Sequence, residues 1–270
     1  MDFPMNIQDY FALAIDYTDR MPLWPYFATP KMNGLRVMWV PGCGFVTRHG
    51  KPYADGVLPE IETALKGATM WLDGELYAHG LSLQEINSRA GVIRESPHPD
   101  RHQICFHVFD SPHLGTGFEA RQLAIAQALP DHPNLKTVPY KNCNCCDHAN
   151  THHDAFVSMG FEGTVYKHPG GYRLGRTDMM VKRKAWQDED FEIVELARGR
   201  TGKYDDTMGA ILCRTKAGKQ FRVGSFDGIN DDERHSIWVG PKPKTAKVKF
   251  LGYTNDNIPY NARVMGVDYQ

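Results

Sequence analysis

Lys31-Met32-Asn33-Gly34-Leu35-Arg36 runs directly into Val37-Met38-Trp39-Val40, an apolar run typical of a buried strand. A lysine beside a glycine turn is most often an ordinary surface residue. Three later segments, however, place carboxylates, glycines and lysines together in a related way: Asp73-Gly74-Glu75, Glu162-Gly163-Thr164-Val165-Tyr166-Lys167 and Lys182-Arg183-Lys184. Carboxylates and lysines at the ends of several strands are typical of a site that handles phosphate groups. We therefore expect these four segments to meet in one phosphate-binding site.

The composition is that of a soluble globular protein, with 41% apolar and 23% charged residues in a chain of 270. This length suits one large domain or two modest ones. No apolar run is long enough to cross a bilayer, and residues 1–9 lack the basic and apolar parts of a signal peptide. We therefore expect a cytoplasmic protein with no membrane partner. The net charge of −1 gives no sign of a nucleic-acid ligand, although a basic face can be hidden in such an average.

The hydrophobic pattern up to Lys184 mixes strands and helices. Leu35–Val40 and Phe45–Arg48 flank a glycine turn and are typical of a hairpin. Ser82 and Glu85 have the spacing of a capping box, which predicts the start of a helix. The other predicted elements are helices at 6–16, 58–66, 118–129 and 152–159, and strands at 70–76, 104–109 and 163–167. The helical period gathers Leu123 and three alanines on one side of the helix at 118–129.

The hydrophobic pattern of the sequence changes after Lys184. About five short strands separated by glycine turns follow between residues 191 and 267, which predicts a small all-β barrel. We expect the boundary in a charged linker at Trp186–Asp190. The predicted fold class is therefore α+β, with a first domain at 1–187 and an all-β domain at 188–270.

Lys31 is a candidate nucleophile, because a lysine amine attacks in its unprotonated form, which burial or neighbouring positive charge favours. Glu75 and Glu162 each adjoin a glycine, which allows a ligand close to the backbone, and carboxylates bind hard cations such as Mg²⁺. Lys182 and Lys184 share a face if they lie in a strand, and they repel unless an anion lies between them. Each feature alone also fits a plainer interpretation, namely a surface lysine, solvated turn glutamates and a basic edge strand.

Two further segments leave alternatives open. Cysteines and histidines gather without a second Cys-x-x-Cys pair, so an irregular polar loop is favoured over a zinc site. They are Cys143, Cys145, Cys146, His148, His152 and His153. The tract Pro241–Lys249 holds four lysines and no acidic residue, and composition alone favours a solvated linker over a nucleic-acid contact.

Taken together and in this order, the segments resemble the nucleotidyltransferase motifs shared by ATP-dependent DNA ligases, RNA ligases and mRNA capping enzymes. The matching motifs are Lys31-x-x-Gly34-x-Arg36, Asp73-Gly74-Glu75, Phe106-His107-Val108-Phe109-Asp110, Glu162-Gly163-x-Val165-x-Lys167 and Lys182-x-Lys184. Thr47-Arg48-His49-Gly50 is similar to the Ser-Arg-Asn-Gly element that follows the first motif in ligases. After Asp190, several stretches resemble the oligonucleotide-binding (OB-fold) domain of minimal DNA ligases of phages and some bacteria: 190–194, 199–204, 208–212, 221–225 and 248–254.

The resemblance implies a nucleotidyltransferase (adenylation) domain, with antiparallel sheets and flanking helices, followed by an OB-fold barrel. It also implies an enzyme that seals 5′-phosphate/3′-hydroxyl nicks in duplex DNA with ATP and Mg²⁺, for which Mn²⁺ can substitute. Lys31 would attack the α-phosphate of ATP and carry AMP, which then moves to the nick before the strands are joined. A monomer that closes around DNA at a hinge near residues 186–190 is the expected form.

By the same resemblance, the other residues take the following roles. Arg36 and Glu75 would hold the ribose, Phe109 would stack on adenine with Phe106 as the fallback, Lys182 and Lys184 would hold the α-phosphate, and Glu162 with Glu75 would bind the metal. Arg48, Arg176, Lys242, Lys244 and Lys247 would contact DNA phosphates, and Lys167 has no assigned role.

Asn33 departs from the family, which usually has aspartate at this position. Asparagine keeps hydrogen bonding but loses the negative charge. RNA ligases tolerate non-acidic residues here, so an RNA or mixed-strand ligase is the first alternative. A non-catalytic nucleic-acid-binding module is the second.

Overall fold

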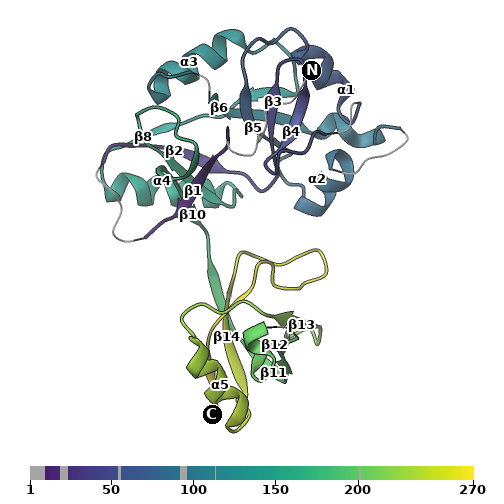
Figure 1. The fold of residues 1–270 in the computed structure, drawn as a ribbon, viewed down its shortest axis with the longest axis vertical. Helices are drawn as coiled ribbons and strands as arrows, with labels where there is room; N and C mark the ends of the chain where they lie inside the picture. The colour runs from purple at the N-terminus through teal and green to yellow at the C-terminus, as the bar shows by residue number, and fades with distance from the viewer. Residues whose placement is uncertain (1–9, 19–23, 54–55, 92–95, 113, 201) are drawn as a thin grey trace. The chain divides into compact units, whose positions relative to one another are not determined.

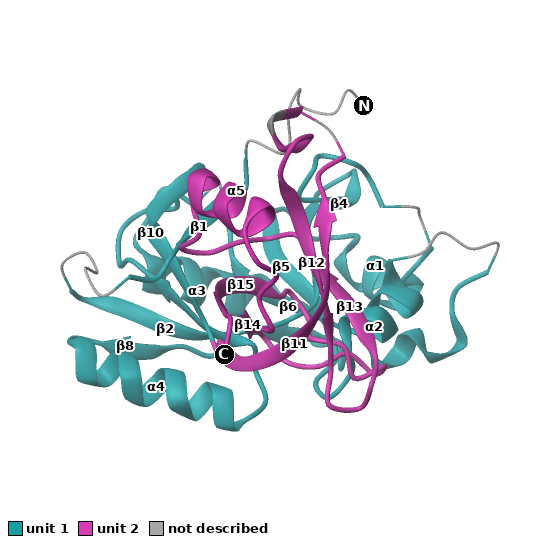
Figure 2. Cartoon of the chain, turned by 90° about the horizontal axis from the view of Figure 1, so that it is seen from below, with its two compact units in different colours: residues 1–184 teal, residues 185–270 magenta. Residues whose placement is uncertain are grey.

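The computed structural model describes residues 10–18, 24–53, 56–91, 96–112, 114–200 and 202–270. The chain divides into two compact units, residues 1–184 and 185–270. Figure 1 labels their helices and strands, and Figure 2 colours the two units separately. None of the described helices is long and apolar enough to span a membrane.

Unit 1 contains two five-stranded sheets. The first has the order β1 (Ala12–Asp16), β10 (Gly175–Lys184), β9 (Gly163–Lys167), β2 (Tyr26–Lys31) and β8 (Lys141–Cys143). The second has the order β4 (Gly44–Thr47), β3 (Leu35–Val40), β5 (Leu72–Tyr77), β6 (Cys105–Asp110) and β7 (Leu135–Thr137). Neighbouring strands are antiparallel except for β1 with β10 and β6 with β7.

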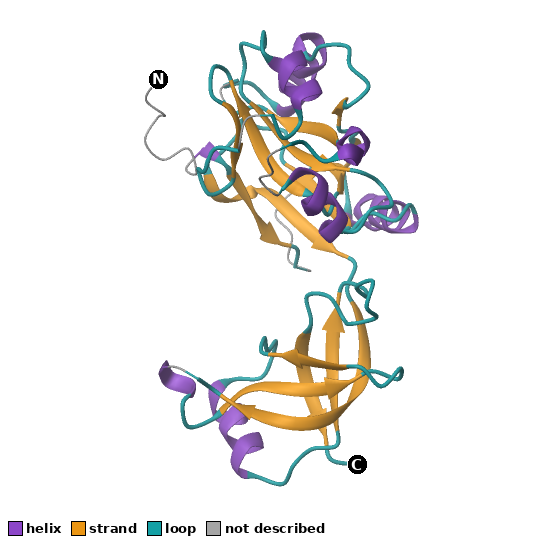
Figure 3. Cartoon of the chain, turned by 90° about the vertical axis from the view of Figure 1, so that its right-hand side faces the viewer, coloured by secondary structure: helices purple, strands orange, loops and turns teal. Residues whose placement is uncertain are grey.

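The helices of unit 1 lie around these sheets, as Figure 3 shows. They are α1 (Pro59–Leu65), α2 (Leu83–Ala90), the 3-10 helix η2 (Pro99–Gln103), α3 (Phe118–Ala128) and α4 (Cys146–Ser158). The predicted capping box is present, because Ser82 accepts from the Glu85 amide and Glu85 accepts from the Ser82 amide. The second sheet packs against α1 and α2 through fully buried residues such as Leu65, Leu76 and Ile86. The first sheet packs against α4 through Ala149 and Tyr166.

The chain crosses from one sheet to the other between β2 and β3. Met32, Asn33 and Gly34 make this crossing, so Lys31 ends a strand of the first sheet just before the second sheet begins. A Cβ at Gly34 would lie 2.3 Å from the Leu76 carbonyl oxygen, so only glycine fits there.

The described part of unit 2, residues 185–200 and 202–270, forms a five-stranded antiparallel sheet with one α-helix. The order is β13 (Gln220–Val223), β12 (Met208–Arg214), β11 (Gln187–Arg198), β14 (Thr245–Phe250) and β15 (Arg263–Asp268). A 3-10 helix, η3 (Gly202–Tyr204), precedes β12, and α5 spans Asp231–Val239. The antiparallel α+β class is thus confirmed. Sequence reasoning missed α5, although Asn230 and Glu233 form a capping box at its start.

Three predictions about local structure were wrong. Residues 12–16 form β1 rather than a helix, because β10 supplies hydrogen-bond partners for an extended strand, while residues 6–9 lie outside the described part. The cysteine- and histidine-rich segment is not a loop: Cys143 ends β8, and α4 begins at Cys146. The charged linker is also absent, since only Ala185 and Trp186 separate β10 from β11. Residues 187–190 extend β11 because they pair with β14.

Candidate active site

The first group of the site comes from three adjacent strands. Lys31 ends β2, Glu162 precedes β9 and Lys184 ends β10, and both lysines lie opposite Gly163 in the register. The Glu162 carboxylate accepts from Lys31 Nζ at 2.6 Å and lies 3.1 Å from Lys184 Nζ. The Glu162 amide donates to the Lys31 carbonyl at 2.9 Å. One carboxylate therefore bridges two lysines that sequence reasoning brought together from separate motifs.

Glycine is required next to this carboxylate. A Cβ at Gly163 would lie 2.0 Å from the Arg183 carbonyl oxygen, and its φ of +153° is one that other residues rarely adopt. The close packing of β9 against β10 at this point holds Glu162 between the two lysines. The Glu-Gly pair in the sequence thus has a geometric cause.

Glu75 adds a second carboxylate beside the nucleophile candidate. It lies on β5 opposite Arg36 of β3, and its carboxylate accepts from the Gly34 amide at 2.9 Å. Burial raises the pKa of Glu75, while the charges of Lys31 and Arg36 act in the opposite direction. The charges of Lys31 and Glu162 both act on Glu75, so the Asp73-Gly74-Glu75 and Glu162-Gly163 motifs face the same site.

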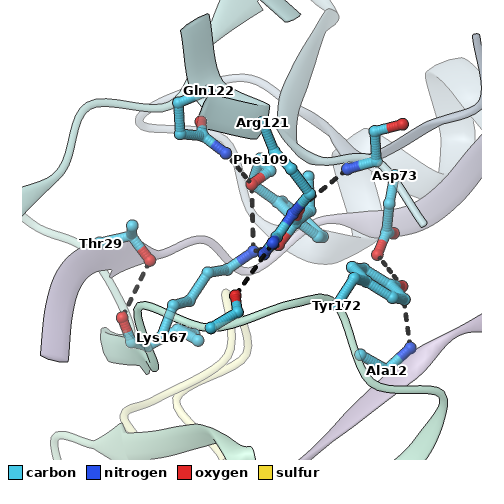
Figure 4. A network of polar contacts seen from close by, with 12 residues as sticks. Ala12, Thr29, Asp73, Phe109, Arg121, Gln122, Lys167 and Tyr172 are labelled. Carbon is cyan, nitrogen blue, oxygen red and sulfur yellow. Dashed lines mark hydrogen bonds and ion pairs between the residues drawn. The ribbon is translucent and has the colours of Figure 1, made fainter. Parts of the chain in front are cut away.

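Arg36 is held by a buried carboxylate. Its Nε and Nη2 donate to the two oxygens of Asp73 at 3.1 and 2.7 Å. Asp73 is completely buried and also accepts from the Tyr172 hydroxyl at 2.7 Å, while that hydroxyl accepts from the Ala12 amide (Figure 4). Burial alone would lower the pKa of Arg36, but Asp73 more than offsets this and the pKa is raised. Arg36 is thus a fixed cation.

Phe109 is half-buried, and its ring lies against two cations. The Arg36 guanidinium carbon is 5.3 Å and the Lys167 Nζ is 4.5 Å from the ring centroid. Phe106, the fallback for base stacking, is fully buried and packs edge-on against Phe45 in the core. Of the two, only Phe109 can meet a ligand.

Lys182 is not part of the Glu162 group. It lies two residues from Lys184 on β10, as the strand prediction requires, but its ammonium pairs with Asp16 of β1 at 3.3 Å. Asn33 is half-buried in the crossing between β2 and β3. Both residues lie close in sequence to the site, but in the part of the chain that the structure describes neither contacts the Glu162 carboxylate.

The residues expected to contact DNA are all exposed, two in unit 1 and three in unit 2. Arg48 is exposed and donates to His49, and Arg176 is exposed and donates to the Ala14 carbonyl. In unit 2, Lys242 is exposed and donates to the Val194 carbonyl, Lys244 is exposed, and Lys247 pairs with Asp188 at 3.0 Å.

The cysteine and histidine side chains of β8 and α4 do not converge on a metal site. Among the described residues, no three cysteine, histidine or acidic side chains are placed to hold an ion. His153 is buried against the Thr164 hydroxyl at 3.0 Å, and burial lowers its pKa to about 4. His152 contacts the Asn142 carbonyl, and burial raises the pKa of Cys143 to about 11. These contacts give the segment a structural explanation.

Sequence reasoning missed Tyr172, Arg121 and Gln122, which surround the Arg36 and Phe109 positions. It also chose the wrong side of α3, because Leu123 is 61% exposed whereas Arg121 and Gln122 are buried. The usable signal was Asp110: a carboxylate at the end of a buried strand needs a cation, and the following helix supplies one.

The chain is similar to DNA ligases in both sequence and fold. Residues 200–267 match the family model for the DNA ligase OB-like domain. The DNA ligase of African swine fever virus (strain Badajoz 1971 Vero-adapted) is 25% identical over 220 residues, which are 73% of this chain and 50% of the viral protein. A second isolate of that virus, Tick/Malawi/Lil 20-1/1983, gives the same figures. The chain therefore spans about half the length of the curated relatives that it matches.

Three solved structures have related folds. A structure from a study of Lig E DNA ligases has a TM-score of 0.80 at 22% identity and covers 95% of this chain and 98% of its own. The Chlorella virus DNA ligase-adenylate has a TM-score of 0.55 at 21% identity, covering 96% and 98%. The ATP-dependent DNA ligase of bacteriophage T7 in complex with ATP has a TM-score of 0.53 at 12% identity, covering 97% and 99%. The resemblance drawn from the motifs is thus confirmed: this chain has the fold of DNA ligases, with a DNA ligase OB-like domain at residues 200–267.

Proposed function

We propose that this protein is an ATP-dependent DNA ligase that seals 5′-phosphate/3′-hydroxyl nicks in duplex DNA through a lysyl-AMP intermediate. The observation that carries the proposal is the Glu162 carboxylate between Lys31 and Lys184, at the crossing between the two sheets. The proposed roles are nucleophile for Lys31, metal ligand for Glu162 and phosphate ligand for Lys184, and Glu162 contacts both lysines there. The ligase fold and the OB-like domain support the choice of a DNA nick as substrate.

The first step is attack on the nucleotide. The Lys31 ammonium loses its proton to solvent, and the neutral Nζ attacks the α-phosphorus of ATP. The bond between that phosphorus and the bridging oxygen breaks, so pyrophosphate leaves and AMP remains joined to Lys31. Lys184 and Lys182, now paired with Glu162 and Asp16, would turn to the phosphates and neutralise their charge.

The two following steps use the same site. An oxygen of the nick 5′-phosphate attacks the AMP phosphorus, which breaks the P–N bond and releases the Lys31 amine. The 3′-hydroxyl then loses its proton and attacks the 5′-phosphorus, and AMP leaves as the strands join. In this scheme Arg36 and Glu75 hold the ribose and Phe109 stacks on the base, in-line geometry being the main requirement.

Glu162 and Glu75 fit a hard cation. Both carboxylates lie at the Lys31 site, and carboxylate oxygen is the donor that Mg²⁺ or Mn²⁺ takes. When bound, the cation would neutralise charge on the phosphates. Glu162 would then exchange its two lysine partners for the metal, which their partial exposure allows.

The experiment is covalent labelling followed by nick sealing. With ATP labelled at the α-phosphate and Mg²⁺, the wild-type protein should carry label through denaturing electrophoresis, and Lys31→Ala should carry none. Lys66→Ala, at an exposed lysine after α1, is the matched control and should label normally. Failure of the wild type to become labelled would refute the proposal.

Asn33 gives a reason to test a second candidate. Asparagine stands at position 33, where the family usually has aspartate, and an RNA or mixed-strand ligase is the alternative that this departure favours. Rates on nicked duplexes that differ only in the sugars at the junction decide between them. Faster sealing of the all-RNA nick would replace DNA by RNA as the substrate while leaving the adenylation chemistry intact.

A further inference from the structure

Four polar side chains are buried around the backbone of Phe109. Asp110, Arg121, Lys167 and Gln122 are only 3%, 2%, 4% and 7% exposed, and they come from β6, α3 and β9. Asp110 accepts from Arg121 at 2.7 Å and from Lys167 at 2.9 Å. Burying charges is costly unless each is paired and hydrogen-bonded, so this arrangement calls for an explanation beyond core packing.

Phe109 is the extra residue of a β-bulge. Val108 lies opposite Gly74 and Asp110 lies opposite Asp73, so Phe109 has no counterpart on β5. A bulge of this kind re-aims a side chain and takes its residue out of the regular ladder. Something else must then fix the orientation of that peptide unit.

The buried side chains do this through the Phe109 carbonyl. Lys167 Nζ donates to that oxygen at 3.1 Å, and Gln122 Nε2 donates to it at 3.0 Å (Figure 4). A carbonyl oxygen has two lone pairs, so both are used. The Lys167 ammonium also lies 4.5 Å from the centre of the Phe109 ring. The peptide unit and the ring are thus held by the same group.

Lys167 is not placed to bind phosphate. It is 4% exposed, and its ammonium already donates to the Phe109 carbonyl and to Asp110. Gln122 is likewise buried and directed at the same carbonyl. Both side chains donate to the Phe109 carbonyl, which gives them a route to nucleotide binding through Phe109.

We propose that Lys167 and Gln122, fixed by Asp110 and Arg121, are positioning residues that orient Phe109 for stacking on the nucleotide base. This inference rests on the proposed function for the identity of the nucleotide. It assigns a role to Lys167, the one motif residue whose role was left open above. It also makes α3 part of the support of the nucleotide site, because Gln122 and Arg121 of this helix donate to the Phe109 carbonyl and to Asp110.

The test is nucleotide binding by Gln122→Met, which keeps the length of the side chain and removes the donor. Calorimetry with α,β-methylene-ATP should show about a three- to tenfold higher Kd, the usual worth of one hydrogen bond. Binding of inorganic tripolyphosphate should be unchanged, because the base end alone is affected. Gln127→Met, at an exposed position of the same helix, is the matched control and should bind both probes normally.

A double-mutant cycle separates positioning from a merely structural role. In a Phe109→Leu background, Gln122→Met should add no further loss of α,β-methylene-ATP binding, because its only route to the base is gone. An equal loss in both backgrounds, or an equal loss for tripolyphosphate, would overturn the proposal. So would an unchanged Kd for α,β-methylene-ATP in a folded Gln122→Met protein.

This binding assay is independent of the covalent step. A wild-type protein that binds α,β-methylene-ATP but is never labelled by ATP refutes the ligase proposal. The double-mutant cycle can still be interpreted in that case, because it measures binding alone. A labelled wild type with an additive cycle refutes the positioning role alone.

Discussion

Unit 1 contains the same arrangement of charges twice, once near solvent and once in the interior. Glu162 bridges Lys31 and Lys184, whose side chains are 20% and 19% exposed. Asp110 bridges Arg121 and Lys167, whose side chains are 3% and 6% exposed. Lysines with access to water can leave a carboxylate for a ligand at little cost, whereas buried cations cannot. We call Glu162 with Lys31 and Lys184 the exchangeable cluster, because its exposure suits the binding of phosphates and metal. We call Asp110 with Arg121, Lys167 and Gln122 the fixed cluster, because its burial suits holding the backbone of Phe109.

The largest effect should follow from Asp110→Asn. Removing this carboxyl charge leaves Arg121 and Lys167 buried without a counter-charge, so we expect unfolding to become easier by about 3–5 kcal/mol. Urea denaturation measures the change. Asp178→Asn is the matched control in the same unit, because Asp178 is 61% exposed and pairs with the exposed Arg173. A loss no larger than that of the control would remove the distinction between the two clusters.

The pH dependence of the stability difference between wild type and Asp110→Asn gives a second test. Burial alone would raise the pKa of Asp110, but the charges of Lys167 and Arg121 more than offset this and the pKa is lowered. A carboxyl with a lowered folded pKa stabilises above its unfolded pKa, about 3.9, and loses this contribution as the pH falls through the folded value. The gap between wild type and Asp110→Asn should therefore stay constant from about pH 7 to 5 and narrow below about pH 4.

Glu162→Gln should lower activity strongly and stability only slightly, in contrast to Asp110→Asn. Both lysines can turn to water, so we expect a stability change of about 1 kcal/mol or less. Lysyl-AMP formation should fall about 100-fold, and half-maximal rate should require more Mg²⁺, because a metal-binding and lysine-orienting carboxylate is lost. Quench-flow with α-labelled ATP measures both quantities, with Glu119→Gln on the exposed side of α3 as control. Wild-type labelling rates would instead make Glu162 a structural residue.

The sequence predicted the exchangeable cluster better than the fixed one. The exchangeable cluster comes from short motifs whose lysine and glutamate residues are recognisable as candidates for phosphate and metal binding. The register of the strands brings Lys31, Glu162 and Lys184 together. The fixed cluster depends on Arg121 and Gln122, which the helical pattern predicts to face solvent because they are polar. Their burial follows from the bulge at Phe109 and the charge of Asp110, which are features of the tertiary structure.

The same limit explains the errors in the fold. A strand such as β1 exists because β10 offers a neighbour, and no local signal in residues 12–16 reports that neighbour. The acidic run at 188–190 was interpreted as a linker because its partner strand, β14, comes 57 to 61 residues later in the chain: Asp188 pairs with Lys249 and Asp190 with Lys247. Local patterns did predict the hairpin, the capped helix α2 and the strands of unit 2, where spacing alone carries the information.

The smallest effect on stability should come from the Lys247–Asp188 pair of unit 2, which is open to solvent. Lys247 pairs with Asp188 across β11 and β14, with both side chains about half exposed, so Lys247→Ala should change stability by less than about 1 kcal/mol. If Lys247 contacts a DNA phosphate, the slope of log affinity for nicked duplex against log salt should become shallower by about one. Lys216→Ala is the control: Lys216 also pairs with an acid of β11, Glu189, but lies outside the 241–249 tract, so its slope should match wild type. Equal slopes for all three proteins would leave Lys247 as a partner of Asp188 only, a surface pair without a role in DNA binding.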